Sequence, residues 1–150
     1  MDRTIFDDIV EGKKKAWIVW QDEEFMAFLT SFPNTPGFTV LIPKRNPGDY
    51  VFGLPDDLYV RFMLATKEVA NILERAFETP RVALVFEGTG IAHVHAKLIP
   101  LHGELAGQTG VWSKETEFYE EYRGWLTTAE GPKMDDAQLD AIQAKIRSVQ

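Results

Sequence analysis

The segment Pro55–Glu78 carries apolar residues at intervals of three and four, which predicts one long amphipathic helix. Its first turn contains Asp56 and Asp57, and carboxylates at that position oppose the helix dipole. A shorter segment, Thr4–Gly12, has apolar residues one, four and five positions apart. This spacing predicts a short N-terminal helix that ends at the glycine.

Five further segments are rich in branched and aromatic residues, which predicts β-strands. These segments are Ala16–Gln21, Phe25–Leu29, Phe38–Ile42, Val82–Phe86 and Ala92–Ile99. Short turns join the first pair and the last pair, the second turn being Glu87-Gly88-Thr89-Gly90. Only one connecting segment is long enough for a crossover helix, so we expect an α+β fold with a five-stranded, mainly antiparallel sheet.

The last part of the chain has a different character. Leu101–Gly110 contains three glycines in ten residues and is expected to be a mobile loop, and Ser113–Arg123 is expected to form an acidic helix. Asp135-x-x-Gln138 resembles a helix N-terminal cap before a last amphipathic helix. We expect one domain over residues 1–110 and a helical C-terminal extension over 111–150. The extension is expected to pack on that domain, because it has too little apolar mass to fold alone.

Composition narrows the class of protein. The chain has 150 residues, a net charge of −7 and no cysteine, which suits one domain and excludes a disulfide scaffold or a Cys-ligated metal. An acidic chain is a poor partner for a nucleic acid polymer, and Lys13-Lys14-Lys15 is expected to be a solvated turn. No segment approaches the ~18 apolar residues of a membrane span or resembles a secretory signal. We therefore expect a cytoplasmic protein without a membrane partner.

Two of the three histidines lie in the last predicted strand. Because side chains alternate along a strand, His93, His95 and Lys97 are expected on one face, with neighbours roughly 6–7 Å apart. The other face is expected to be a core face, formed by Ala92, Val94, Ala96 and Leu98.

Three interpretations of this histidine face are open. The face can be merely solvated. The two histidines can chelate a metal, with His102 or Glu87 as a third ligand, although Lys97 would repel the cation. One imidazole can instead attack phosphorus while Lys97 neutralises phosphate oxygens. The preceding glycines favour this last interpretation, because they let backbone N–H groups approach an anion.

The chain resembles the histidine-triad (HIT) family of nucleotide hydrolases and transferases, whose signature is His-x-His-x-His followed by two apolar residues. The corresponding segment here is His93-Val94-His95-Ala96-Lys97-Leu98-Ile99. The resemblance covers roughly residues 4–102. It continues upstream in Thr4-Ile5-Phe6, Ile9-Val10-Glu11-Gly12, Phe25-Met26-Ala27-Phe28-Leu29 and Pro36-Gly37-Phe38-Thr39-Val40-Leu41-Ile42-Pro43-Lys44-Arg45.

The resemblance implies a fold, an activity and a set of residue roles. The implied fold is a five-stranded antiparallel sheet with flanking helices, in a homodimer. The implied nucleophile is His95, which attacks the α-phosphorus of a nucleotide to give a nucleotidyl-histidine that water then cleaves. His93 is expected to orient the site, or to form hydrogen bonds without touching the substrate. Substrate contacts are expected from Ile5, Phe6, Phe28, Thr30, Asn46, Gly88, Thr89 and Gly90.

Several positions depart from the family pattern. Lys97 replaces the third histidine, Asn46 replaces a further histidine, and Thr30 stands where the family has a ribose-binding aspartate. The sequence Gly88-Thr89-Gly90 lacks the usual glutamine. These departures affect the leaving group, the rate and the nucleoside affinity, and leave the nucleophile in place.

The predicted function is that of a nucleotide phosphohydrolase or nucleotidyl transferase. It would act on a dinucleoside polyphosphate, a nucleoside phosphoramidate or a nucleotidyl-sulfate. No cofactor or metal is required, and magnesium would enter only with a polyphosphate substrate. Two alternatives remain at this stage: a nucleotide-binding protein with weakened catalysis, and a metal-dependent enzyme that uses His93 and His95.

Overall fold

The computed structural model describes residues 2–107, 112–113, 116–122, 124, 126 and 132–147. The chain divides into two compact units, residues 1–107 and residues 108–150. That the extension packs on the domain stays a prediction. Among the described residues, the structure contains no helix with the length and apolarity needed to cross a membrane.

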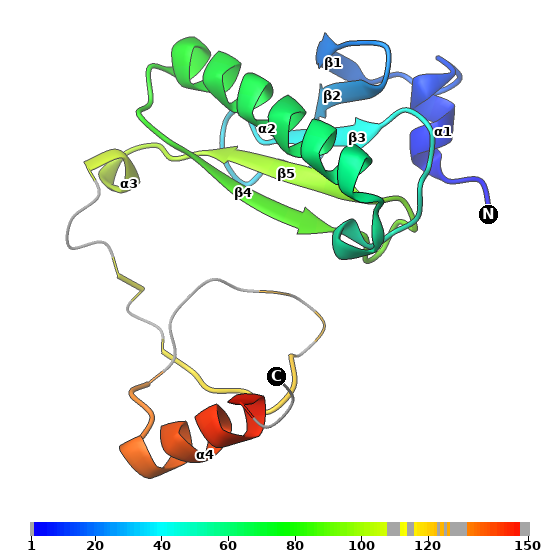
Figure 1. Cartoon of the computed structure of the whole chain (residues 1–150). Helices are drawn as coiled ribbons and strands as arrows, with labels where there is room; N and C mark the ends of the chain where they lie inside the picture. The colour runs from blue at the N-terminus through cyan, green and yellow to red at the C-terminus, as the bar shows by residue number, and fades with distance from the viewer. Residues whose placement is uncertain are drawn as a thin grey trace. The chain divides into compact units, whose positions relative to one another are not determined.

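The first unit is an α+β fold around an antiparallel sheet, as expected (Figure 1). The five strands have the order β1-β2-β3-β5-β4. Their bounds are β1 Trp17–Gln21, β2 Phe25–Leu29, β3 Thr39–Pro43, β4 Val82–Glu87 and β5 His95–Pro100. The helices of this unit are α1 Ile5–Val10, the 3₁₀ helix η1 Val51–Gly53, α2 Asp56–Phe77 and α3 Glu104–Gly107.

The connections follow from the strand order. β1 and β2 form the predicted hairpin, and β5 lies between β3 and β4 and is antiparallel to both. β3 and β4 are therefore parallel to each other, and the chain between them includes α2, the predicted crossover helix. Figure 1 shows α2 running along the sheet.

The sheet is buried on both faces in its centre. One core joins α2 to the sheet and contains Phe62, Val69, Leu41 and Leu98, all 0–1% exposed. The second core joins α1 to the opposite side chains of β2 and β3. Its members are Phe6, Ile9, Met26, Phe28, Val40 and Ile42. The alternation of side chains along each strand thus supplies both cores.

Helix α1 is held at its start by a capping box. The Thr4 hydroxyl accepts from the Phe6 N–H at 3.2 Å, and the Asp7 carboxylate accepts from the Thr4 N–H at 2.6 Å. These bonds satisfy amide groups that the first turn leaves without helical partners. The chain leaves the helix through Gly12, which has a φ of +72° that glycine adopts without strain. The predicted short helix is confirmed.

Strand β5 begins at His95, three residues later than predicted. The preceding backbone bonds to a loop instead of a neighbouring strand: the Val94 N–H donates to the Gly48 carbonyl at 2.8 Å. The Asn46 amide likewise donates to the Ala92 carbonyl at 2.9 Å. Val94, Ala96 and Leu98 lie in the core as expected, whereas Ala92 is exposed. His93 therefore precedes the strand, although its ring packs on the same side as that of His95, against Phe6.

The end of the chain differs from prediction in two places. The expected loop Leu101–Gly110 contains helix α3, and its residues 108–110 lie outside the described part. The acidic helix expected over Ser113–Arg123 is wrong for the described residues 116–119, which form no helix. Phe118 and Tyr122 there are exposed, and a short helix without a buried face is unstable in water.

The last predicted helix is confirmed as α4, Asp136–Arg147. The Asp135 carboxylate accepts from the Gln138 N–H at 2.8 Å, as the capping pattern predicted.

Gly88 occupies a position with no room for a side chain. A Cβ atom there would lie 1.7 Å from the Asp49 carbonyl oxygen, which is backbone and cannot rotate away. We expect Gly88→Ala to lower the free energy of unfolding by about 1–3 kcal/mol, measured by urea denaturation. The matched control is Gly107→Ala, where no atom lies within 4 Å of the added carbon, and its expected change is below about 1 kcal/mol. Equal stability of the two variants would contradict the prediction.

Candidate active site

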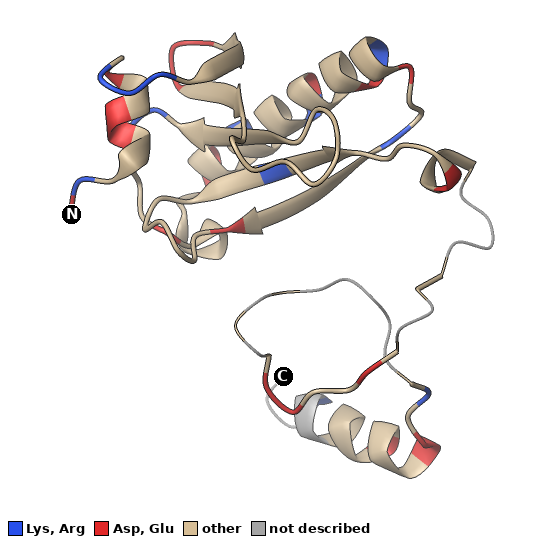
Figure 2. Ribbon diagram, turned by 180° about the vertical axis from the view of Figure 1, so that it is seen from behind, with Lys and Arg blue, Asp and Glu red and all other residues tan. Residues whose placement is uncertain are grey.

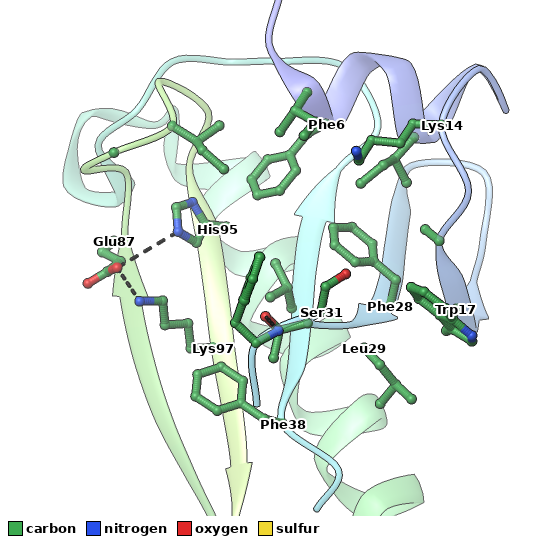
Figure 3. Close-up of a pocket in the computed structure, with 18 of the residues that line it drawn as sticks. Phe6, Lys14, Trp17, Phe28, Leu29, Ser31, Phe38, Glu87, His95 and Lys97 are labelled. Atoms are coloured by element: carbon green, nitrogen blue, oxygen red, sulfur yellow. Dashed lines mark hydrogen bonds and ion pairs between the residues drawn. The ribbon is translucent and has the colours of Figure 1, made fainter. Parts of the chain in front are cut away.

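A pocket of about 860 Å³ lies beside α1, β2, β3 and β5 (Figure 3). Eight of the residues expected at the site line it. They are Ile5, Phe6, Phe28, Thr30, Thr89, Gly90, His95 and Lys97. The structure thus gathers side chains that are up to 92 positions apart in the sequence around one cavity.

Aromatic rings form much of the apolar wall. The Phe6 ring packs edge-on against Phe28, with ring centroids 5.6 Å apart, and edge-on against the His95 imidazole at 5.3 Å. Phe38 also lines the cavity. Flat apolar surfaces of this kind suit a planar aromatic ring, which can stack or pack edge-on there.

His95 presents one free ring nitrogen to the pocket. Its Nδ1 lies 2.8 Å from the His93 carbonyl oxygen, which can only accept, so Nδ1 carries the hydrogen. Nε2 then keeps its lone pair. Burial lowers the pKa of His95 below its ordinary 6.5, against smaller raising effects of the His93 carbonyl and Glu87. The imidazole is therefore neutral near pH 7 and can act as a nucleophile through Nε2.

His93 has a different environment. It is fully buried and lies outside the pocket lining, and its Nε2 donates to the Pro43 carbonyl at 2.7 Å. Its Nδ1 has no hydrogen-bond partner, and burial lowers the pKa of the ring. His93 therefore serves the site through its carbonyl and its packing against Phe6, with ring centroids 5.5 Å apart. Its ring lies on the same side as that of His95, as the strand alternation predicted, since both rings pack against Phe6, but unlike His95 and Lys97 it does not line the pocket.

Glu87 is the nearest carboxylate to the free nitrogen of His95. Its Oε1 lies 3.9 Å from His95 Nε2 and also forms an ion pair with Lys97 Nζ (Figure 3). Glu87 and Lys97 are the single charged residues of β4 and β5 (Figure 2). From the sequence, Glu87 was expected at most as a third metal ligand. Glu87 is identified as a site residue by the register of the two strands, which pairs its Cα with that of His95.

Asn46 and Gly88, both expected to contact phosphate, lie outside the pocket lining. The Asn46 side chain is engaged twice, since its amide donates to the Ala92 carbonyl and its oxygen accepts from the Gly48 N–H at 3.0 Å. Gly88 packs against the Asp49 backbone. The two residues shape the segment before β5, and the structure does not bring them to the cavity.

The lysine triplet is exposed, as expected of a solvated turn, and two of its members also line the pocket. Lys13 pairs with Glu11 at 2.6 Å, whereas Lys14 and Lys15 line the pocket. The Lys15 ammonium lies 5.1 Å from the centre of the Trp17 ring, which also lines the cavity. The sequence pattern does not reveal this placement, because it depends on how the turn after α1 meets the sheet.

The part of the chain that the structure describes offers no set of side chains for the metal site considered above. No three His, Asp or Glu side chains converge there in a way that could hold an ion. His93 Nε2 is engaged with Pro43 and Lys97 stands beside His95, so the two imidazoles do not form a chelating pair.

Comparison with known proteins places this geometry in a family. Residues 11–104 match the HIT domain, and the chain belongs to the HIT family. "Protein hit" of Bacillus subtilis is 27% identical over 123 residues, which are 79% of this chain and 84% of that protein.

Solved structures of HIT proteins share the fold. A HIT family protein from Bacillus anthracis is 25% identical, with a TM-score of 0.64, over 99% of this chain and 98% of that one. A HIT family hydrolase from Legionella pneumophila is 23% identical, with a TM-score of 0.56, over 67% of this chain and 95% of that one.

The hydrogen bonds predict opposite tautomers for the two histidines. At pH 7 the proton of His95 should reside on Nδ1 and that of His93 on Nε2, because each nitrogen faces a carbonyl oxygen. Nitrogen-15 NMR of the imidazoles distinguishes the two forms, and loss of one signal set in His95→Asn assigns the resonances. The His95 signal should titrate with a midpoint below 6.5. A proton on Nε2 of His95 at pH 7 would show that the lone pair is not available.

Proposed function

We propose that the protein is a nucleotide phosphohydrolase or nucleotidyl transferase. It cleaves at the α-phosphate of a nucleoside phosphate derivative, of the dinucleoside polyphosphate or phosphoramidate type. The observation that supports this proposal is the His95 imidazole, neutral by burial, with Nε2 open to a pocket beside the Lys97 ammonium.

The reaction takes place in two steps. The Nε2 lone pair forms a bond to the α-phosphorus, and the leaving group departs with the electrons of its bond to phosphorus. Water then attacks the phosphorus and loses a proton to the solvent, the N–P bond breaks, and Nε2 regains its lone pair. The product is a nucleoside monophosphate. In a transferase another acceptor takes the place of water.

The remaining lining residues fit the parts of such a substrate. The base would lie along Phe6 and Phe28, with Ile5 beside it and Thr30 near the ribose. Thr89 and Gly90 offer hydroxyl and backbone groups to phosphate oxygens, and Lys97 offers a positive charge. The chemistry needs no cofactor, and magnesium would enter only with a polyphosphate. That the similar Legionella protein is a hydrolase agrees with this proposal. A cytoplasmic homodimer stays a prediction.

One observation favours a second candidate, a nucleotide-binding protein with weakened catalysis. The Lys97 ammonium is already paired with Glu87, so it is not free to neutralise an incoming phosphate without exchanging partners. This candidate binds a mononucleotide and forms no covalent adduct.

His95→Ala should abolish turnover, because it removes the nucleophile, while the protein stays folded. The test mixes the protein with a panel of adenylated and guanylated substrates, quenches without acid, and maps nucleotidyl adducts by mass spectrometry. An adduct on His95 is expected in the wild-type protein. His102→Ala is the matched control, since His102 lies outside the pocket and bonds to the Pro36 carbonyl. An active His95→Ala protein would refute the mechanism, and bound nucleotide with no adduct would favour the second candidate.

Lys97→Ala should weaken the binding of a nucleoside monophosphate by about tenfold or more. The change removes a positive charge and leaves the Glu87 carboxylate without its ion-pair partner beside His95 Nε2. Isothermal titration measures the affinity. Lys67→Ala, at an exposed position of α2, is the control for loss of a charge elsewhere. Affinity and turnover that both remain unchanged in Lys97→Ala would remove this residue from the site.

A further inference from the structure

We propose that Glu87 offsets the charge of Lys97 beside the nucleophile, and so lowers the preference that the site would otherwise have for the doubly charged terminal phosphate of a free mononucleotide over a phosphoryl group with a single negative charge, one that is esterified or amidated on two sides. The inference rests on the proposed function, because it takes His95 Nε2 as the atom that approaches phosphorus. Beyond the proposed function, it assigns Glu87 a role in specificity and states the charge of the preferred substrate.

The Glu87 carboxylate lies close to the atom that attacks phosphorus. Glu87 Oε1 lies 3.9 Å from His95 Nε2, and a phosphorus poised for attack must come within roughly 3–3.5 Å of the same nitrogen. The phosphorus therefore lies no farther than about 7 Å from Glu87 Oε1, a distance at which two charges still interact in a partly buried site. The side chain is 21% exposed, so water screens this repulsion only in part.

The charges next to the nucleophile sum to zero. His95 is neutral, Lys97 contributes one positive charge and Glu87 one negative charge. The other charged residues of the pocket lining are Lys14 and Lys15, and Figure 3 shows Lys14 across the cavity from Glu87. Repulsion by Glu87 grows with the charge on the ligand, so a dianion is penalised about twice as much as a monoanion.

The chain holds Glu87 at this point through its backbone. Glu87 is the last residue of β4, and its Cα pairs with that of His95 across the two strands. The next residue, Gly88, is seated against the Asp49 carbonyl, which limits withdrawal of the strand end. The carboxylate is thus a fixed part of the site and not a mobile surface group.

This arrangement matches the charges along the proposed reaction. The substituted α-phosphate of the substrate and the nucleotidyl-histidine each carry one negative charge at phosphorus. The released monophosphate carries close to two at pH 7, because its second pKa is about 6. Glu87 therefore disfavours the product relative to the substrate and promotes its release.

Isothermal titration of the full chain at pH 7.5 tests the inference with adenosine and guanosine 5′-monophosphates and their methyl phosphoesters. Each pair differs in charge at phosphorus but shares base and ribose. Glu87→Gln should raise the affinity for the monophosphate about tenfold and that for the methyl ester about threefold, because the gain in affinity grows with the charge of the ligand. Glu23→Gln makes the same change of charge in the exposed β1–β2 turn and should leave the affinity for both ligands unchanged.

A second variant, Lys97→Met, should change the two affinities in the opposite direction. It leaves Glu87 unopposed, so the monophosphate should lose about tenfold in affinity and the ester about threefold. An unchanged ratio of the two affinities in both variants would overturn the charge selectivity and leave the proposed function standing. If no ligand bound the wild-type protein, the proposed function and this inference would fail together.

Discussion

The seating of the Asn46–Asp49 loop against the segment 88–94 is the contact on which the site depends. The Gly48 carbonyl and the Asn46 amide take the backbone groups of Val94 and Ala92 that would otherwise extend β5. The strand therefore starts at His95, and the His93 carbonyl lies where it accepts from His95 Nδ1. A hydrogen bond between two backbone segments of different loops thus decides which imidazole nitrogen faces the pocket. Gly88 is required for the same reason, since a Cβ at this position would clash with the Asp49 carbonyl.

The sheet gives the nucleophile a rigid support. Ala96 and Leu98 are buried under α2, so the alternate residues of β5, His95 and Lys97, face the other side and the pocket. Phe6 of α1 packs against the His95 ring and closes one wall. Burial against these groups also lowers the pKa of the imidazole, because a charged ring would lose hydration there. The contacts that hold the His95 ring in place therefore also keep it neutral.

Lys97, which the resemblance aligns with the third histidine of the family signature, forms an ion pair here. Lys97 cannot act as a neutral imidazole would, and its charge is offset by Glu87 on the neighbouring strand. The pair keeps the surroundings of His95 close to neutral, although Lys97 by itself would make a strong anion site. The charge of Lys97 on β5 is thus offset by a partner on the neighbouring strand β4.

The sequence by itself determined the helices α1, α2 and α4, the presence of five strands, the α+β class, the resemblance to the family, and the placement of His95 and Lys97 on one strand face. These features follow from local patterns, because helix and strand periods and the motif can be read within a few residues. Only the tertiary structure decided where β5 begins, why His93 lies outside the pocket, and why Lys14 and Glu87 belong to it. The Asn46–Ala92 bond joins residues 46 positions apart, and Glu87 meets His95 through the register of two strands joined by an irregular turn. No local pattern encodes such contacts, since they arise from the packing of separate segments.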